Sequence, residues 1–320
     1  HRYSTFLVEC HLFRNKNKLK SFLIMGEDYT PLPWNKFFDK QEFVTINETD
    51  KFCIYLKGNS GPVFYLIHGA GFSGLTWAVL TNSLTTAMEC RILAVDLRGH
   101  GMTTTSNDLD LSKERLVDDI YKVYNVVYGE EKPKLIMIGH SLGGAIAIHL
   151  AAKNILPNLQ ALGVIDVVEG TALASLTTMR LILDKRPSSF PSIESAIQWC
   201  TNTHVTINST SARVSMPDQI KEHNGKYIWR VDLYKSEKYW QEWFKDISKQ
   251  FLSVPGAKIL ILAGTDRLDK ELTIAQMAGK FQMEVVKKTG HLVHEDSPED
   301  VACIFIRMMK RYKMAKIFEE

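Results

Sequence analysis

"LIMIGHSLGGAIAIHLA", residues 135–151, changes character in its middle. An apolar run comes first, and a helix-like pattern of small and apolar residues follows. The junction, GHSLG (139–143), fits the pattern G-x-S-x-G. When a buried strand turns sharply into a helix, this pattern exposes the serine hydroxyl at the edge of a sheet, and the glycines let neighbouring chain pass closely. Ser141 is therefore the candidate nucleophile.

Other apolar runs resemble the first half of this stretch. They lie at residues 62–69, 91–96, 161–166, 258–264 and 283–291. Continuous apolar runs are typical of strands buried on both faces, as in a parallel sheet covered by helices. Helical patterns alternate with them at 113–128, 142–153, 270–282 and 298–313. This alternation predicts an α/β fold with a mostly parallel central sheet flanked by helices.

Two further segments are candidates for strands at one edge of the sheet. Residues 41–58 are expected to form antiparallel strands, and residues 5–9 are a further candidate. Ser112 is the expected N-cap of the helix at 113–128, because serine side chains accept hydrogen bonds from the first turn.

Residues 171–256 interrupt the alternation of strands and helices. This segment is rich in helical patterns and contains four of the six tryptophans. We expect it to be a helical cap inserted over the strand ends, with residues 30–170 and 257–320 forming the core. Residues 1–29 are expected to be a flexible N-terminal extension, and their basic start leaves organelle targeting open.

Composition excludes several classes of function. The chain has 320 residues and a net charge of only +3, which is too weak to indicate nucleic-acid binding. No apolar run approaches the roughly 18 residues that would span a membrane. The five scattered cysteines form no C-x-x-C pair or metal-ligand cluster, so we expect free thiols and no metal site. Free thiols indicate a reducing compartment, here the cytoplasm, the nucleus or both.

A serine hydroxyl needs a general base and an acid that orients the base. His291 directly follows the apolar run at 283–290 and is the favoured base, with His294 as the alternative three residues later. Asp166 and Asp266 both follow apolar strands and both keep the chain order serine, aspartate, histidine. Position alone slightly favours Asp266.

A tetrahedral intermediate also needs two hydrogen-bond donors for its oxyanion. The backbone N–H of Leu142 is one candidate. The loop HGAGFSG (68–74) offers the other through Ala70, with Gly71 as the neighbour that could share the role. These features predict a serine hydrolase that acts on acyl groups. Other polar side chains are expected to pack or brace the fold: His68, Asp96, His140 and His149.

Several motifs together resemble one family, the protein phosphatase methylesterases. They are LTWAVL (75–80), GHSLGGAIAIH (139–149), IDVVEGTA (165–172), SARVSM (211–216), EKYWQEWF (237–244) and LAGTDRLDKELTIAQMAGKFQM (262–283). The resemblance extends from about residue 30 to residue 299. Members of this family remove the methyl ester from the C-terminal carboxylate of the protein phosphatase 2A catalytic subunit.

The resemblance implies an α/β-hydrolase fold with a helical cap and no cofactor. It implies that Ser141, Asp166 and His291 form the catalytic triad, and that Asp266 is structural. It also implies a partner, the phosphatase catalytic subunit, recognised by its methylated tail and its folded surface.

The chain departs from the family at three places. Leu142 stands where methionine is usual, Ala70 replaces a glycine, and residues 217–226 replace a loop that is often long and charged. Functions attached to that loop therefore cannot be carried over. Two alternatives stay open: a general small-ester or lipid serine hydrolase, and a phosphatase-binding module without catalysis.

Overall fold

An eight-stranded sheet organises the computed structural model, which describes residues 28–264 and 268–318. The strand order is β1-β2-β4-β3-β5-β6-β9-β10; β2 pairs antiparallel with both β1 and β4, and all other neighbouring strands are parallel. The strands are β1 (Lys40–Thr45), β2 (Lys51–Lys57), β3 (Val63–Ile67), β4 (Arg91–Val95), β5 (Leu135–His140), β6 (Leu159–Ile165), β9 (Ala257–Leu262) and β10 (Gln282–Val285). The predicted, mostly parallel sheet with antiparallel strands at one edge is confirmed.

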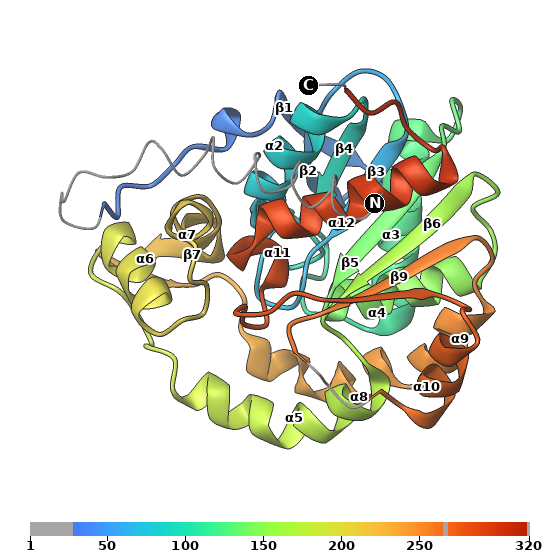
Figure 1. Ribbon diagram of the computed structural model, residues 1–320. Coiled ribbons are helices and arrows are strands. Elements are labelled where there is room, and N and C mark those ends of the chain that lie inside the picture. The colour runs from blue at the N-terminus through green and yellow to red at the C-terminus, as the bar shows by residue number, and fades with distance from the viewer. Residues whose placement is uncertain (1–27, 265–267, 319–320) are drawn as a thin grey trace.

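Helices cover both faces of this sheet, which explains the continuous apolar runs (Figure 1). One face carries α3 (Lys113–Tyr128), α4 (Leu142–Ala152), α9 (Ile247–Ser253) and α10 (Lys270–Met277). The other carries α2 (Ala78–Ala87) and α12 (Pro298–Tyr312).

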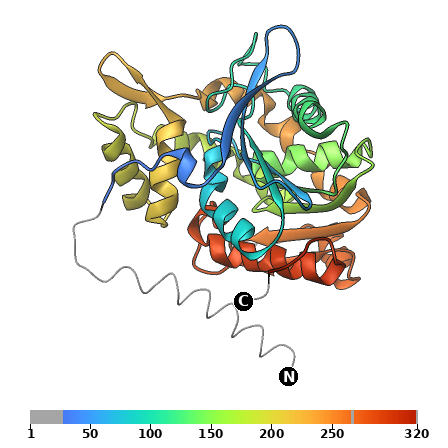
Figure 2. The same ribbon diagram turned by 90° about the horizontal axis from the view of Figure 1, so that it is seen from above.

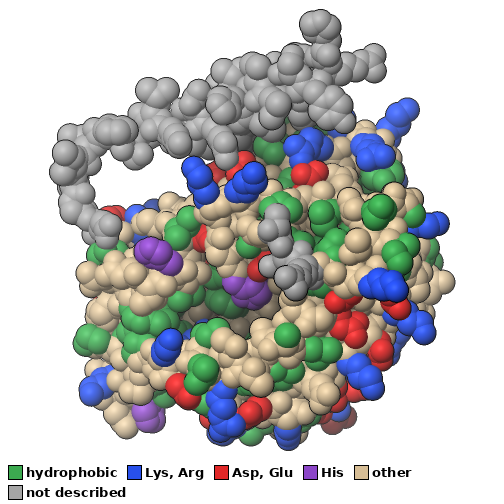
Figure 3. Space-filling model, turned by 60° about the horizontal axis from the view of Figure 1, so that its bottom comes forward, with side chains coloured by type: hydrophobic (Ala, Val, Ile, Leu, Met, Phe, Trp, Pro, Cys, Tyr) green, Lys and Arg blue, Asp and Glu red, His purple; other side chains and the backbone are tan. Residues whose placement is uncertain are grey.

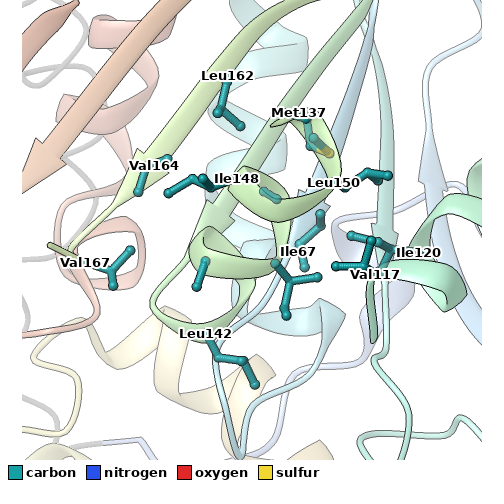
Figure 4. Close-up of a cluster of buried hydrophobic side chains, with 14 of the residues drawn as sticks. Ile67, Val117, Ile120, Met137, Leu142, Ile148, Leu150, Leu162, Val164 and Val167 are labelled. Atoms are coloured by element: carbon teal, nitrogen blue, oxygen red, sulfur yellow. The ribbon is translucent and has the colours of Figure 1, made fainter. Parts of the chain in front are cut away.

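Successive side chains of a strand point to opposite faces and so enter different cores. In β3, Tyr65 and Ile67 belong to the core around α4, whereas Phe64 and Leu66 belong to the core under α12. Figure 4 shows the first of these cores, where Ile67, Met137, Leu162 and Val164 of three strands meet side chains of α3 and α4. The helix α4 is buried on nearly all sides, so the turn before it is held firmly in place.

The structure corrects two boundaries and the role of one capping side chain. The last strand, β10, is shorter than predicted and ends at Val285, so a loop leads to His291. The helix α10 ends at Met277, because Gly279 adopts a left-handed φ of 68°. Ser112 is the N-cap of α3, but its hydroxyl donates to Asp110 instead of capping the helix.

The segment between β6 and β9 contains α5 (Glu169–Asp184), α6 (Ile193–Asn202), α7 (Ser209–Ser215) and α8 (Trp240–Phe244) before α9. It also contains a hairpin, β7 (Ile220–His223) and β8 (Lys226–Trp229), which Figure 2 shows projecting from one side. This hairpin was not predicted, although its turn residues Asn224 and Gly225 have positive φ angles of 51° and 75°, as an Asn-Gly turn favours. The division into core, cap and extension stays a prediction.

The candidate strand at 5–9 and most of the predicted N-terminal extension lie outside the described residues. Within 28–264 and 268–318, no helix has both the length and the apolar character that crossing a membrane would require.

Candidate active site

Ser141 occupies the turn between β5 and α4 in a strained conformation. Its φ is 51° and its ψ is −120°, a region that non-glycine residues rarely adopt. The turn is possible because a Cβ at Gly139 would lie 2.2 Å from the carbonyl oxygen of Gly143, and a Cβ at Gly143 would lie 2.2 Å from that of Ile67. Both flanking positions of the motif therefore need glycine, and the predicted strand-turn-helix geometry is present.

Asp166 follows β6, the neighbour of β5, and lies beside this turn. The Ser141 N–H donates to the Ile165 carbonyl at 3.0 Å, which fixes the two strand ends together. Asp166 also has a positive φ, 53°. Its Oδ1 accepts from the Ala263 N–H at 2.9 Å, and its Oδ2 accepts from Nδ1 of His291 at 2.7 Å.

The bond to Asp166 determines the state of the His291 ring. A carboxylate can only accept, so Nδ1 carries the proton and the lone pair lies on Nε2. The side chain of His291 is 54% exposed, whereas that of Asp166 is 10% exposed. The ring is thus oriented from one side and open on the other, as a general base requires.

The loop that carries His291 is fastened next to Ser141. Nε2 of His140, the residue before Ser141, donates to the His291 carbonyl at 2.8 Å, and the two rings lie 4.6 Å apart. The Gly290 N–H donates to Oδ2 of Asp296 at 2.6 Å. Among the described residues, the Ser141 hydroxyl and the His291 ring form no hydrogen bond with each other. Figure 3 shows histidine and acidic side chains together in a hollow of the surface.

The alternative base, His294, has a different environment. It is fully buried, stacks on Trp77 with ring centroids 4.2 Å apart, and pairs through Nε2 with the Thr76 hydroxyl at 2.9 Å. Burial lowers the pKa of His294 to about 3, so its ring is neutral. It therefore packs the wall behind the site. The alternative acid, Asp266, lies outside the described residues.

His68 braces the loop that follows β3, as expected. Its Nε2 accepts from the Leu97 N–H at 2.9 Å, so Nδ1 carries the proton and donates to the Gly69 carbonyl at 2.8 Å. Burial keeps the pKa of His68 well below its usual value, so the ring stays neutral in this role. The loop itself is close to the nucleophile, because a Cβ at Gly69 would lie 3.3 Å from Cβ of Ser141.

The next two residues of this loop, Ala70 and Gly71, differ in whether the backbone N–H group is free to bind a ligand. The Gly71 N–H donates to Nε2 of His100 at 2.9 Å and is therefore occupied. Burial lowers the pKa of His100 to about 4, which keeps Nε2 available as an acceptor. Among the described residues, the N–H groups of Ala70 and Leu142 have no such partner. Of the two candidates in the loop, Ala70 is thus the one with a donor to offer.

Two further polar residues behave as expected. Asp96 accepts from the N–H groups of Gly74 and Met102, at 2.6 and 2.9 Å, and so holds the turn after β4. His149 is satisfied by the side chain of Gln250 at 2.8 Å and the carbonyl of Trp243 at 2.9 Å.

Sequence reasoning missed the positions of His100 and Asp296. Asp296 joins the His291 loop to the segment before α7, because its Oδ1 also accepts from Thr206 and from the Ile207 N–H, both at 2.8 Å. No local pattern identifies either residue, because His100 binds Gly71 and Asp296 binds Thr206 and Ile207, all of which are distant in sequence. No group of three His, Cys, Asp or Glu side chains suited to a metal ion occurs in the described part of the chain.

Comparison with known proteins shows which family the chain resembles. The model of the alpha/beta hydrolase family matches residues 64–302. The chain is 50% identical over 291 residues to the "Probable protein phosphatase methylesterase 1" of Caenorhabditis elegans, covering 90% of this chain and 80% of that protein. It is 42% identical to "Protein phosphatase methylesterase 1" of Mus musculus, covering 90% and 87%.

A solved structure, that of E-2-(acetamidomethylene)succinate hydrolase, shares the fold. Its TM-score is 0.69 at 19% identity, and the match covers 85% of this chain and 99% of that one. The family model and the two relatives agree with one another. The chain belongs to the alpha/beta hydrolase family and, within it, to the protein phosphatase methylesterases.

Proposed function

We propose that this chain hydrolyses the methyl ester on the C-terminal carboxyl group of the protein phosphatase 2A catalytic subunit, with Ser141 as nucleophile. The observation that carries the proposal is the Asp166–His291 pair at 2.7 Å, next to a serine held at positive φ. The names of the two relatives supply the ester and the phosphatase as the class of substrate.

In this reaction His291 takes the proton of the Ser141 hydroxyl through Nε2 as the oxygen attacks the ester carbonyl. The N–H groups of Ala70 and Leu142 stabilise the oxyanion, and Asp166 stabilises the imidazolium. His291 then returns the proton to the methoxide, so that methanol departs and an acyl-enzyme remains. Water, deprotonated by the same ring, attacks the acyl group, and Ser141 leaves with the proton to give the free carboxylate.

The substrate must be recognised mainly on its acyl side. Methanol offers only two heavy atoms for contact, so little binding energy can come from the leaving group. The peptide tail and the folded surface of the phosphatase must provide the rest. A general esterase would lack this dependence and would hydrolyse small esters as efficiently as the protein substrate.

The test combines labelling with turnover. A fluorophosphonate probe should label the wild-type protein and Ser175→Ala, a change at an exposed serine of α5, but not Ser141→Ala. Demethylation of methylated phosphatase should fall by about 1,000-fold or more in Ser141→Ala. Full demethylation by Ser141→Ala would exclude Ser141 as the nucleophile. Equal kcat/KM for an aryl ester and for methylated phosphatase would favour the general esterase.

A further inference from the structure

Arg186 is a partly buried cation that no acidic group of the described chain neutralises. It follows α5, two residues after that helix ends. Its guanidinium lies over the ring of Trp229 in β8, 4.5 Å from the centroid. Within the described residues its side chain forms no hydrogen bond and no ion pair. Burial lowers the pKa of the guanidinium, but an arginine still stays charged at neutral pH.

The guanidinium also lies against the loop that carries Ala70. A Cβ at Gly71 would be 3.8 Å from Nη1 of Arg186 and 3.1 Å from Cδ1 of Leu233. The loop cannot easily move away from this contact, because the Gly71 N–H is held by His100. Arg186 therefore lies beside the loop that carries Ala70, the proposed oxyanion donor.

Other groups near Arg186 bring no negative charge to it. Cys200 and Tyr234 are the titratable side chains that act on it, and both are neutral near pH 7. Burial raises the pKa of Cys200 to about 12, and a hydrogen bond to Asp184 raises that of Tyr234. The carboxylate of Asp184 accepts the hydroxyl of Tyr234 at 2.5 Å and forms no ion pair with Arg186.

Arg98 is a buried guanidinium with a structural role, and the fold provides it with two acidic partners. It pairs with Asp50 at 2.8 Å and with Asp119 at 2.7 Å. Removing a charge from water without such partners is unfavourable. A guanidinium without an acidic partner is suited to an anionic group such as a carboxylate, with which it can form two parallel hydrogen bonds. Arg186 has no such acidic partner among the described residues.

We propose that Arg186 binds a carboxylate side chain of the substrate peptide, located a few residues before the esterified C-terminal residue. The inference rests on the proposed function and names its substrate class, an acidic C-terminal tail. The anion must be a side chain because the terminal carboxyl is esterified and neutral until the reaction is complete. Arg186 thereby determines specificity, and Trp229 holds its plane in place.

The test uses synthetic hexapeptides with a C-terminal methyl ester. Five pairs differ only in carrying glutamate or glutamine at one position before the ester. For the wild-type protein, glutamate should raise kcat/KM by about 10-fold or more at one position, mainly through a lower KM. Arg186→Met should reduce the ratio of kcat/KM between the glutamate and glutamine peptides to about 1. Its kcat/KM for the glutamine peptide should stay within about 3-fold of the wild-type value.

A second arginine, Arg180 within α5, provides the matched control. Arg180 is exposed and pairs with Glu237 at 3.0 Å, so Arg180→Met should keep the full ratio. Arg186→Lys keeps the charge but loses the planar fork, and should retain part of the ratio. Thermal unfolding and aryl-ester turnover show whether each variant is intact. If Arg186→Met is not intact, Arg186→Lys is measured in both 50 mM and 500 mM salt. An ion pair weakens with salt, so a glutamate-to-glutamine ratio equal to that of the wild-type protein in both salts opposes the proposal.

The outcomes separate this inference from the proposed function. If the peptides are not turned over, their inhibition of phosphatase demethylation gives the same glutamate-to-glutamine ratio. A ratio near 1 at every position in the wild-type protein, or an unchanged ratio in Arg186→Met, overturns the role of Arg186 while methylesterase activity stands. Absence of demethylation of both peptides and phosphatase overturns the proposed function and this inference with it.

Discussion

Replacing Asp166 by asparagine tests the candidate triad most directly, because the structure fixes how the new side chain must lie. In the wild-type chain Oδ1 of Asp166 accepts from the Ala263 N–H at 2.9 Å, and Oδ2 accepts from His291 at 2.7 Å. The asparagine oxygen will stay with the Ala263 donor, since the amide nitrogen cannot accept there. The NH₂ group then faces Nδ1 of His291.

Two donors cannot share that contact, so the His291 ring must change tautomer. Nδ1 becomes the acceptor and the proton moves to Nε2, the nitrogen that has to take the proton of Ser141. Loss of the correct tautomer in such a triad lowers kcat by about 10,000-fold, or about 5.5 kcal/mol in activation free energy. The shape of the side chain hardly changes, so the midpoint of thermal unfolding should stay close to that of the wild-type protein.

The assay is release of methanol from methylated phosphatase, measured for Asp166→Asn beside Asp266→Asn. Asp266→Asn is the necessary comparison, because chain position alone slightly favours that residue as the acid. We expect it to keep most of the wild-type kcat. The reasoning is refuted if Asp166→Asn retains more than about a tenth of the wild-type kcat, or if Asp266→Asn shows the larger loss.

Two further predictions concern stability. Gly143→Ala should lower the free energy of unfolding by about 2 kcal/mol or more, because its Cβ would lie 2.2 Å from a backbone oxygen of Ile67, whereas Gly264→Ala meets no atom within 4 Å and should be tolerated. Equal midpoints in urea for the two variants would contradict this. Burial raises the pKa of Glu295 to about 8, so the folded chain keeps a proton that the unfolded chain loses near its usual value of 4.5. The free energy of unfolding should therefore fall as pH rises from about 5 to about 8, by up to about 1.4 kcal/mol per pH unit for this group, and Glu295→Gln should flatten that slope. An unchanged slope in urea titrations would speak against a protonated Glu295.

Much of the fold was readable because it depends on local patterns. The apolar runs that became β3, β5, β6 and β9 are continuous since both faces of each strand are buried, and the sequence displays this directly. Local patterns do not fix the ends of strands: the run at 283–291 predicts one strand, but only Gln282–Val285 pairs with β9. The Asn224-Gly225 pair is also a local hairpin signal, but it lies within a segment whose patterns predict helices.

Contacts between distant residues could not be read in the same way. Asp166 and His291 are 125 positions apart, and their contact depends on the order of β5, β6 and β9 in the sheet and on the loop fixed by Asp296. The surroundings of Arg186 are similarly assembled from Gly71 and Trp229, which belong to separate parts of the chain.

The sequence by itself determined the class of fold and the location of the serine turn, because strand burial and the two glycines beside Ser141 are properties of short stretches. The positions of the residues left two acids open, and the tertiary structure decided which one meets His291. It also decided which N–H of the loop after β3 remains free, and that Arg186 has no acidic partner among the described residues. Each of these depends on where separate segments come together in space, and side-chain hydrogen bonds are decided by ångström-scale distances that no local pattern encodes.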